Sequence, residues 1–160
     1  MTFYYPKSQI LRRNKERLHC GRQFGIFNKY KIIPKFCFSC YKVQITLTNV
    51  LNLIKIYFYF NDLYLEKNNI RKCMIEFREN VSGNYKGYLY SSSINEAKNI
   101  KKKITNDLIN GEINYEKIAI KHGCTEYYDQ FKLYKNIDED ITDRVYQKEW
   151  GNIEKEVDRD

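Results

Sequence analysis

Alternation of hydrophobic and polar positions predicts a pair of neighbouring strands between residues 71 and 92. From Arg71 to Arg78 the hydrophobic side chains recur at every second position, which is the period of a strand with one buried face. A tight turn is expected at residues 82–84, because Gly83 and Asn84 tolerate the positive φ angle that a hairpin requires. A second, tyrosine-rich strand follows from Tyr85 to Ser92. The side chains expected on the buried face of the first strand are Cys73, Ile75 and Phe77.

A helix is predicted directly after this hairpin. Ser93 and Glu96 match the capping-box pattern, in which a serine oxygen accepts from a free helical amide and the glutamate reaches back. The helix is expected to end at Asn110 and Gly111, since glycine favours the left-handed residue that closes many helices.

An earlier strand and helix are predicted between residues 41 and 64. Residues 41–48 alternate, with Val43, Ile45 and Leu47 on one face and Lys42, Gln44 and Thr46 on the other. Asn49 is expected to cap a helix through about Tyr64. Residues 53–60 also suit a strand because they are aromatic and β-branched, but the absence of Gly and Pro favours the helix. Its expected buried stripe is Val50, Leu51, Ile54 and Phe58.

A final strand over residues 114–121, closed by His122 and Gly123, completes the order β-α-β-β-α-β. Over residues 41–121 this order resembles the ferredoxin-like architecture, so an α+β sandwich is expected. Many unrelated activities share that architecture, and the resemblance implies no particular function. The whole chain is expected to form one folding unit, with a basic arm and lead-in (1–40), a ferredoxin-like core (41–124) and an acidic C-terminal docking helix (125–160).

Both ends of the chain carry weaker helical patterns. Near the N-terminus, Ser8 is expected to cap a short basic helix, and Gly21 and Gly25 are expected to bracket a break. Phe24, Ile26 and Phe27 are expected to dock on the main body. The C-terminal helix is expected over residues 142–157, with a docking stripe of Tyr146, Trp150, Ile153 and Val157 at spacings of four, three and four.

The net charge of +8 is distributed unevenly along the chain. Residues 1–42 hold ten Lys or Arg residues against one Glu, whereas residues 137–160 hold four against nine acidic residues. This asymmetry predicts either an anionic partner for the basic end or contact between the two ends within the molecule. The N-terminus lacks the apolar segment of a secretory signal, and the run Val50–Phe60 is too short to span a bilayer. A cytoplasmic protein without a transmembrane segment is therefore expected.

Four of the five cysteines form a candidate metal site. An odd number of cysteines in such a chain favours thiols or metal ligation over a disulfide framework. In a ferredoxin-like sheet the four would meet at one end, where thiolates suit zinc or an iron–sulfur cluster. The alternative is that they are small buried hydrophobic residues. The expected ligands are Cys37, Cys40, Cys73 and Cys124, with His19, Cys20 and His122 as substitutes.

The second candidate site is an interface for nucleic acid. The segment KGYLY at residues 86–90, followed by a helix containing Glu96, resembles the third strand and second helix of the RNA-recognition motif. In that family aromatic side chains at the third and fifth positions stack on bases, which implies this role for Tyr88 and Tyr90. Single-stranded RNA or DNA is therefore the expected partner. The residues expected to bind it are Tyr88, Tyr90, Lys42, Arg78 and Lys86 on the open sheet face, with Arg12, Arg13 and Arg17 in the basic arm.

Two other classes of function stay open. A metal- or thiol-dependent enzyme would use Cys37, Cys40, Cys124 and His122, although no nucleotide-binding loop, nucleophile elbow or zinc-protease motif is present. A protein-interaction module would instead bind a basic partner through the acidic C-terminal helix.

Overall fold

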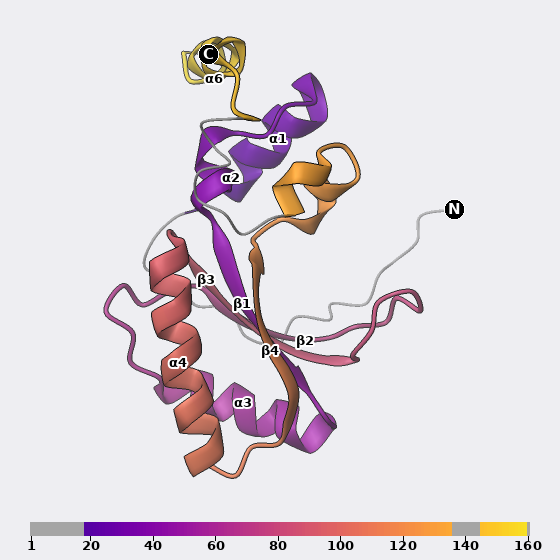
Figure 1. The fold of residues 1–160 in the computed structure, drawn as a ribbon, viewed down its shortest axis with the longest axis vertical. Helices are drawn as coiled ribbons and strands as arrows, with labels where there is room; N and C mark the ends of the chain where they lie inside the picture. The colour runs from indigo at the N-terminus through magenta and orange to yellow at the C-terminus, as the bar shows by residue number, and fades with distance from the viewer. Residues whose placement is uncertain (1–17, 136–144, 160) are drawn as a thin grey trace.

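The computed structural model describes residues 18–135 and 145–159, which form an α+β fold around an antiparallel four-stranded sheet (Figure 1). The strands are β1 (Tyr41–Leu47), β2 (Arg71–Ile75), β3 (Tyr85–Ser91) and β4 (Tyr115–His122). The helices are α1 (Cys20–Tyr30), α2 (Lys35–Ser39), α3 (Val50–Asp62), α4 (Ile94–Asn110) and α6 (Lys148–Val157), with 3-10 turns η1 (Thr125–Tyr128) and η2 (Lys132–Lys135). The strand order is β2-β3-β1-β4.

The register of the central strand confirms the predicted alternation. Lys42 pairs with Tyr90 on β3 and with Lys121 on β4, while Gln44 pairs with Tyr88. Because residues that pair directly across a sheet project to the same side, these five side chains share one face. The opposite face carries the odd-numbered residues of β1 and β3 and is covered by α3 and α4.

Both covering helices begin where the sequence predicts. The Asn49 side chain accepts a hydrogen bond from the Asn52 amide at 2.9 Å, and Ser93 Oγ accepts one from the Glu96 amide at 3.2 Å. The Glu96 carboxylate reaches back and accepts from the Ser92 amide at 2.8 Å. The bonds to Asn49 and Ser93 satisfy amides of the first helical turn, which have no intrahelical partners, whereas the Ser92 amide lies one residue before the N-cap. The predicted end of α4 at Asn110 and Gly111 is also confirmed.

Helix α3 forms as predicted, but the expected buried stripe is wrong. Val50, Leu51, Ile54 and Phe58 are exposed by 43%, 67%, 47% and 61%, and Leu53, Ile56 and Phe60 are buried instead. Both faces of this helix are apolar, so the sequence offered two stripes. Gly87 on β3 explains which one packs inward: a Cβ atom there would lie 3.1 Å from Ile56 Cγ2 and 3.2 Å from Phe60 Cζ. Only glycine allows so close an approach of α3 to the sheet.

Strand β2 ends at Ile75, three residues before the predicted end. The Glu76 carboxylate accepts hydrogen bonds from the backbone amide of Arg78 at 3.1 Å and from its Nε at 2.8 Å. Such local side-chain bonds compete with the strand ladder and turn the chain out of it. Phe77, predicted to be buried, is consequently 62% exposed.

The two ends of the described chain pack together beyond one end of the strands (Figure 1). The predicted break at Gly21 and Gly25 is wrong, because α1 runs through both residues. The packed ends form a second hydrophobic cluster, separate from the core between the sheet and helices α3 and α4. Ile26 is buried in this second cluster, as predicted, and Phe27 packs against it. The other core residues of the second cluster are Ile32, Ile33, Cys37, Phe38, Tyr127, Tyr134 and Trp150.

Helix α6 begins at Lys148, whereas the sequence predicts the helix from residue 142, so Tyr146 precedes it. The predicted stripe docks on the second cluster, with Trp150 buried and Tyr146, Ile153 and Val157 packed against that cluster. Its acidic side chains face α1: Arg22 Nη1 lies 3.1 Å from Glu154 and Arg22 Nε lies 2.6 Å from Asp158. Contact between the basic and acidic ends within the molecule is therefore present. No helix in residues 18–135 or 145–159 has the length and apolar character needed to cross a membrane.

Candidate anion-binding site on the open sheet face

The face of the sheet opposite α3 and α4 is cationic. Residues that pair across neighbouring strands form rows on this face, each of which we call a rung. The rung nearest α1 carries Tyr90 on β3, Lys42 on β1 and Lys121 on β4. The next rung carries Lys72 on β2, opposite Tyr88. Three lysines from three different strands therefore surround two tyrosines.

These side chains line a hollow of about 600 Å³. It is lined by residues of the strands and by two further segments. The first is the beginning of α1 with the residue before it, represented by Leu18, Cys20 and Phe24. The second is residues 123–126, which follow β4. A hollow of this volume is within the range of small-ligand sites.

Lys42 is the most buried cation of the hollow, at 7% exposed. Its Nζ donates a hydrogen bond to the Gly123 carbonyl at 3.1 Å. The pKa of Lys42 is lowered to about 8, mainly by burial; the Glu126 carboxylate acts in the opposite direction, and the nearby ammonium of Lys72 adds to the lowering. Burial has replaced the water around this ammonium group with few protein partners, which disfavours its charged form. An anion that entered the hollow would therefore stabilise the charged form of Lys42.

The two tyrosines lie where the sequence predicts, but they are less accessible than an open face implies. Tyr88 is 6% exposed. Lys72 Nζ is 5.1 Å from the centroid of the Tyr88 ring and 5.7 Å from that of Tyr90, and Lys42 Nζ is 5.5 Å from the Tyr88 ring. Lysine ammonium groups thus take part in cation–π contacts with both rings. Burial also raises the pKa of Tyr88 to about 12, so its hydroxyl stays protonated at neutral pH.

Two of the predicted contact residues are paired with a carboxylate within the protein. Arg78 Nη2 lies 2.7 Å from Glu76, and Lys86 Nζ lies 3.8 Å from the same carboxylate. The hydrogen bond from Arg78 is the main cause of a Glu76 pKa of about 2. Lys86 is 2% exposed and does not line the hollow, so its predicted contact with nucleic acid is not supported. Arg78 does line it, with its charge largely balanced.

Two lysines of the hollow were missed at the level of sequence. Lys72 precedes Cys73 on β2, and Lys121 precedes His122 on β4. The alternation that placed Lys42 on the open face places both of them there as well, so the signal was present. Arg12, Arg13 and Arg17 lie outside the described residues.

The four predicted metal ligands are not brought together. Cys73 is the third residue of β2, and its side chain lies in the core between the sheet and the helices. Cys37 belongs to the second cluster, where Cys20, Cys40 and Cys124 are close enough to affect its ionisation. Across residues 18–135 and 145–159, no three His, Cys, Asp or Glu residues are placed to hold a metal ion. Zinc or an iron–sulfur cluster stays a prediction, which elemental analysis of the purified protein tests.

The thiols are also poorly suited to nucleophilic catalysis. Burial raises the pKa of Cys40 to about 12 and that of Cys124 to about 11, so both stay protonated at neutral pH. The thiolate is the reactive form of cysteine. His122 is fully buried, and its ring stacks between Tyr41 and Tyr134 at centroid distances of 4.6 and 4.3 Å. These contacts give His122 a packing role.

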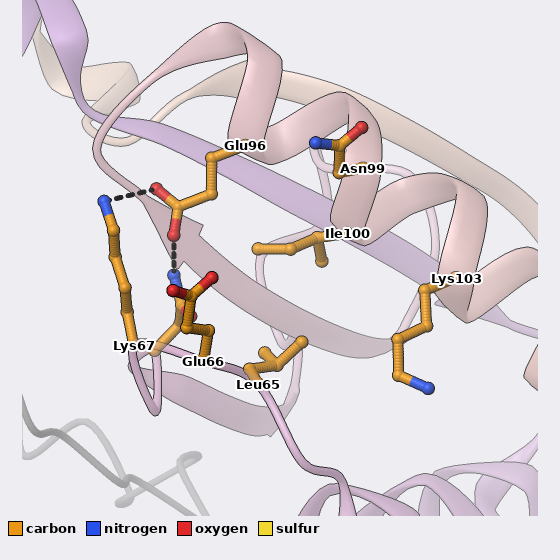
Figure 2. Close-up of a pocket in the computed structure, with 8 residues that line it drawn as sticks. Leu65, Glu66, Lys67, Glu96, Asn99, Ile100 and Lys103 are labelled. Atoms are coloured by element: carbon orange, nitrogen blue, oxygen red, sulfur yellow. Dashed lines mark hydrogen bonds and ion pairs between the residues drawn. The ribbon is translucent and has the colours of Figure 1, made fainter.

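A second pocket, of about 360 Å³, lies between α4 and the loop that follows α3 (Figure 2). Figure 2 shows Lys67 and Glu96 pointing toward one another, with Lys103 further along α4. Glu96 accepts a hydrogen bond from Asn69 at 2.8 Å and lies 3.5 Å from Lys67 Nζ, while Lys103 pairs with Asp107 at 3.0 Å. These groups already have partners within the protein, and the contacts of Glu96 stabilise the start of α4. This pocket is therefore the weaker candidate for a ligand site.

Comparison with known proteins does not change the choice between the two pockets. No protein-family model, curated protein or solved structure matches the chain. What the protein binds therefore has to be inferred from the residues of the hollow.

Proposed function

We propose that the protein binds single-stranded nucleic acid, RNA or DNA, in the hollow on its open sheet face. The observation that carries this proposal is the position of Lys42, Lys72 and Lys121 around Tyr88 and Tyr90. Within the described part of the chain, no carboxylate lies within ion-pair distance of Lys42 or Lys121. Phosphate groups would supply the missing negative charge.

The tyrosines fit the same ligand. When the ammonium groups move to phosphates, the rings they now cover become available to bases. Stacking of a base on an aromatic side chain stabilises such complexes by about 1–3 kcal/mol and tolerates any sequence. The hollow therefore favours binding governed by charge and stacking, with little preference for sequence.

The proposal includes a ferredoxin-like core of the kind found in the RNA-recognition motif. Read from the other edge, the sheet runs β4-β1-β3-β2, with β1 and β3 in the centre. Two β-α-β units with both helices on one face give this order, because each helical connection crosses over one intervening strand. The order supports the assignment, as does the position of Tyr88 and Tyr90 on a central strand.

Fluorescence anisotropy with labelled single-stranded oligonucleotides tests the proposal. We expect the logarithm of the binding constant to fall linearly with the logarithm of salt concentration, by about 0.7 for each phosphate contacted. Tyr90→Leu, which keeps an apolar side chain in place, is expected to weaken binding about tenfold through lost stacking. Tyr88→Ala combined with Tyr90→Ala is expected to weaken it further.

The matched control is Tyr64→Leu. Tyr64 is 81% exposed and lies in the loop after α3, on the other side of the sheet from the hollow. Its loss is expected to leave binding unchanged. Binding that is insensitive to salt, or equally weakened by Tyr64→Leu and Tyr90→Leu, would exclude the hollow as the nucleic-acid site.

A further inference from the structure

The outward side of α3 carries an apolar stripe that is exposed on the surface. Leu51, Ile54 and Phe58 recur at spacings of three and four residues. At about 100° per residue they lie within about 60° of one another around the helix axis. Val50 extends the stripe at its N-terminal end. The opposite side of α3 packs against the sheet, so these four residues have no part in that core.

The stripe is also free of charge. Lys55 is the only charged residue of α3 before Asp62. Its Nζ donates a hydrogen bond to the Glu112 carbonyl at 3.2 Å, which directs the ammonium group toward the loop after α4. Apolar residues spaced by three and then four positions form the surface by which one helix packs against another. The outward side of α3 therefore suits a second helix.

The exposed area is large enough for the core of a dimer interface. From their exposed fractions, the four stripe residues present on the order of 400 Å² of apolar surface. Two such stripes packed on one another would remove about 800 Å² from water. Since roughly 60% of an interface is apolar, the complete contact would bury about 1,300 Å². That area lies at the low end of the range for specific interfaces.

The ends of α3 favour a second copy of the same helix in antiparallel orientation. Asp62 is the last residue of α3, where the helix dipole disfavours negative charge, and the first turn contains no acidic residue. None of the ion pairs in the described part of the chain involves Asp62. An antiparallel pair would set Asp62 of each copy beside the N-terminal end of the other helix, where negative charge is favourable.

We infer that the protein forms a symmetric homodimer through the outward sides of two antiparallel α3 helices. In this dimer a two-fold axis passes close to Ile54, which packs on Ile54 of the second copy. Leu51 of each protomer then packs on Phe58 of the other, because a two-fold interface pairs each contact with its reciprocal. The hollow is on the opposite side of the sheet from α3, so it stays open in both protomers. The inference therefore goes beyond the proposed function and does not depend on it.

Sedimentation velocity of the full-length protein tests the inference. An interface of this size predicts a dissociation constant on the order of 10–100 µM. Between about 1 and about 300 µM, the average mass is expected to rise from 19.4 kDa toward twice that value. At about 1 µM the monomer predominates, so stability measurements at that concentration report the monomer.

Opposite charges at Ile54 distinguish a second copy from any other occupant of the stripe. Ile54→Asp and Ile54→Lys each bring two like charges together at the two-fold axis, and each is expected to weaken the dimer at least about 100-fold. An equimolar mixture of the two variants pairs opposite charges and is expected to bind at least about tenfold tighter than either variant alone. Thermal unfolding of each variant checks that the fold is intact.

The matched control is Leu133→Asp. Leu133 is also an exposed apolar residue, but it lies on η2, beside Tyr134 of the second cluster. Its replacement is expected to leave the dimer unchanged.

Three outcomes would overturn the inference. The first is a mass of 19.4 kDa at every concentration; if Phe58 also resists hydroxyl-radical labelling in that monomer, another segment of the same chain covers the stripe. The second is a dimer that persists in both Ile54 variants. The third is a dimer that is lost in each variant and does not return in the mixture, which would exclude antiparallel pairing about Ile54.

Discussion

Burial of Lys42 couples its protonation to folding. In the folded protein its pKa is lowered from 10.5 to about 8, first because burial removes water from the ammonium group. The unfolded chain therefore holds the proton more tightly between pH 8 and pH 10.5. Across that window the contribution of Lys42 to stability improves as pH rises, because the folded protein no longer has to bury a charge.

Replacing Lys42 with methionine makes this coupling measurable. Below pH 8 the Lys42→Met variant is expected to gain stability relative to the wild type, because no charge is buried. That advantage should shrink by up to about 3 kcal/mol between pH 8 and pH 10.5. Urea unfolding at pH 7, 8, 9 and 10.5 measures the difference, from which other titrating groups such as Cys124 and Tyr88 largely cancel. Lys117→Met, at an exposed position, serves as control; parallel pH curves for Lys42→Met and wild type would contradict the expectation.

For single residues, the sequence predicts on which face of the sheet a side chain lies. It does not predict which other side chain that residue will bind. Alternation placed Lys42, Tyr88 and Tyr90 correctly on the open side of the sheet. It gave no sign that Glu76, nominally on the same strand as Arg78, would bind that arginine and end the strand. A two-residue loop contact depends on side-chain geometry that hydrophobic periodicity does not encode.

At the scale of elements, α3 shows how a helix can be predicted while its orientation is not. Phe58 and Phe60 are both apolar and only two positions apart, but they project about 200° apart around the helix axis. The sequence does not distinguish them, since either stripe satisfies helical periodicity. The choice depends on Gly87, which is distant in sequence and provides the space for Phe60.

Alanine substitutions of these two phenylalanines should differ sharply in their effect on stability. Phe60 is fully buried, and Phe60→Ala is expected to lower the free energy of unfolding by about 3–5 kcal/mol through the cavity it leaves. Phe58 is 61% exposed, and Phe58→Ala is expected to cost less than about 1 kcal/mol. Chemical denaturation of the two variants measures both values. Equal losses would mean that the outward face of α3 is covered in solution.

At the scale of the whole molecule, two hydrophobic clusters stabilise the fold. The first lies between the sheet and α3 and α4, and the second joins α1 and α2 to the C-terminal segments. The sequence predicted the core strands and the docking stripe of α6. The charge asymmetry predicted contact between the two ends as one of two alternatives, but hydrophobic periodicity did not predict their common cluster, because it joins residues more than a hundred positions apart and leaves no local pattern.

The docking of α6 combines the ion pairs of Arg22 on α1 with the packing of Trp150 among aromatic rings, and the rings are expected to dominate. Trp150 is 7% exposed, and its ring packs at 5.3 Å from Phe131 and 5.8 Å from Tyr146. Trp150→Ala is expected to cost about 3–5 kcal/mol within the second cluster. Arg22→Gln is expected to cost less than about 1 kcal/mol, because the pair with Asp158 is exposed and screened by solvent.

Hydrogen exchange locates the effect of Trp150→Ala. Faster exchange is expected in the amides of α1 and α6, with β1 and β3 unchanged, if the second cluster opens as a separate cooperative unit.

Since the start of α1 lines the hollow, Trp150→Ala should also weaken ligand binding without removing any lysine. After Arg22→Gln, Glu154 still accepts hydrogen bonds from the Lys35 amide and Tyr146, so that variant should retain wild-type exchange and binding. Uniformly faster exchange throughout the sheet in Trp150→Ala would instead show that the two clusters unfold as one.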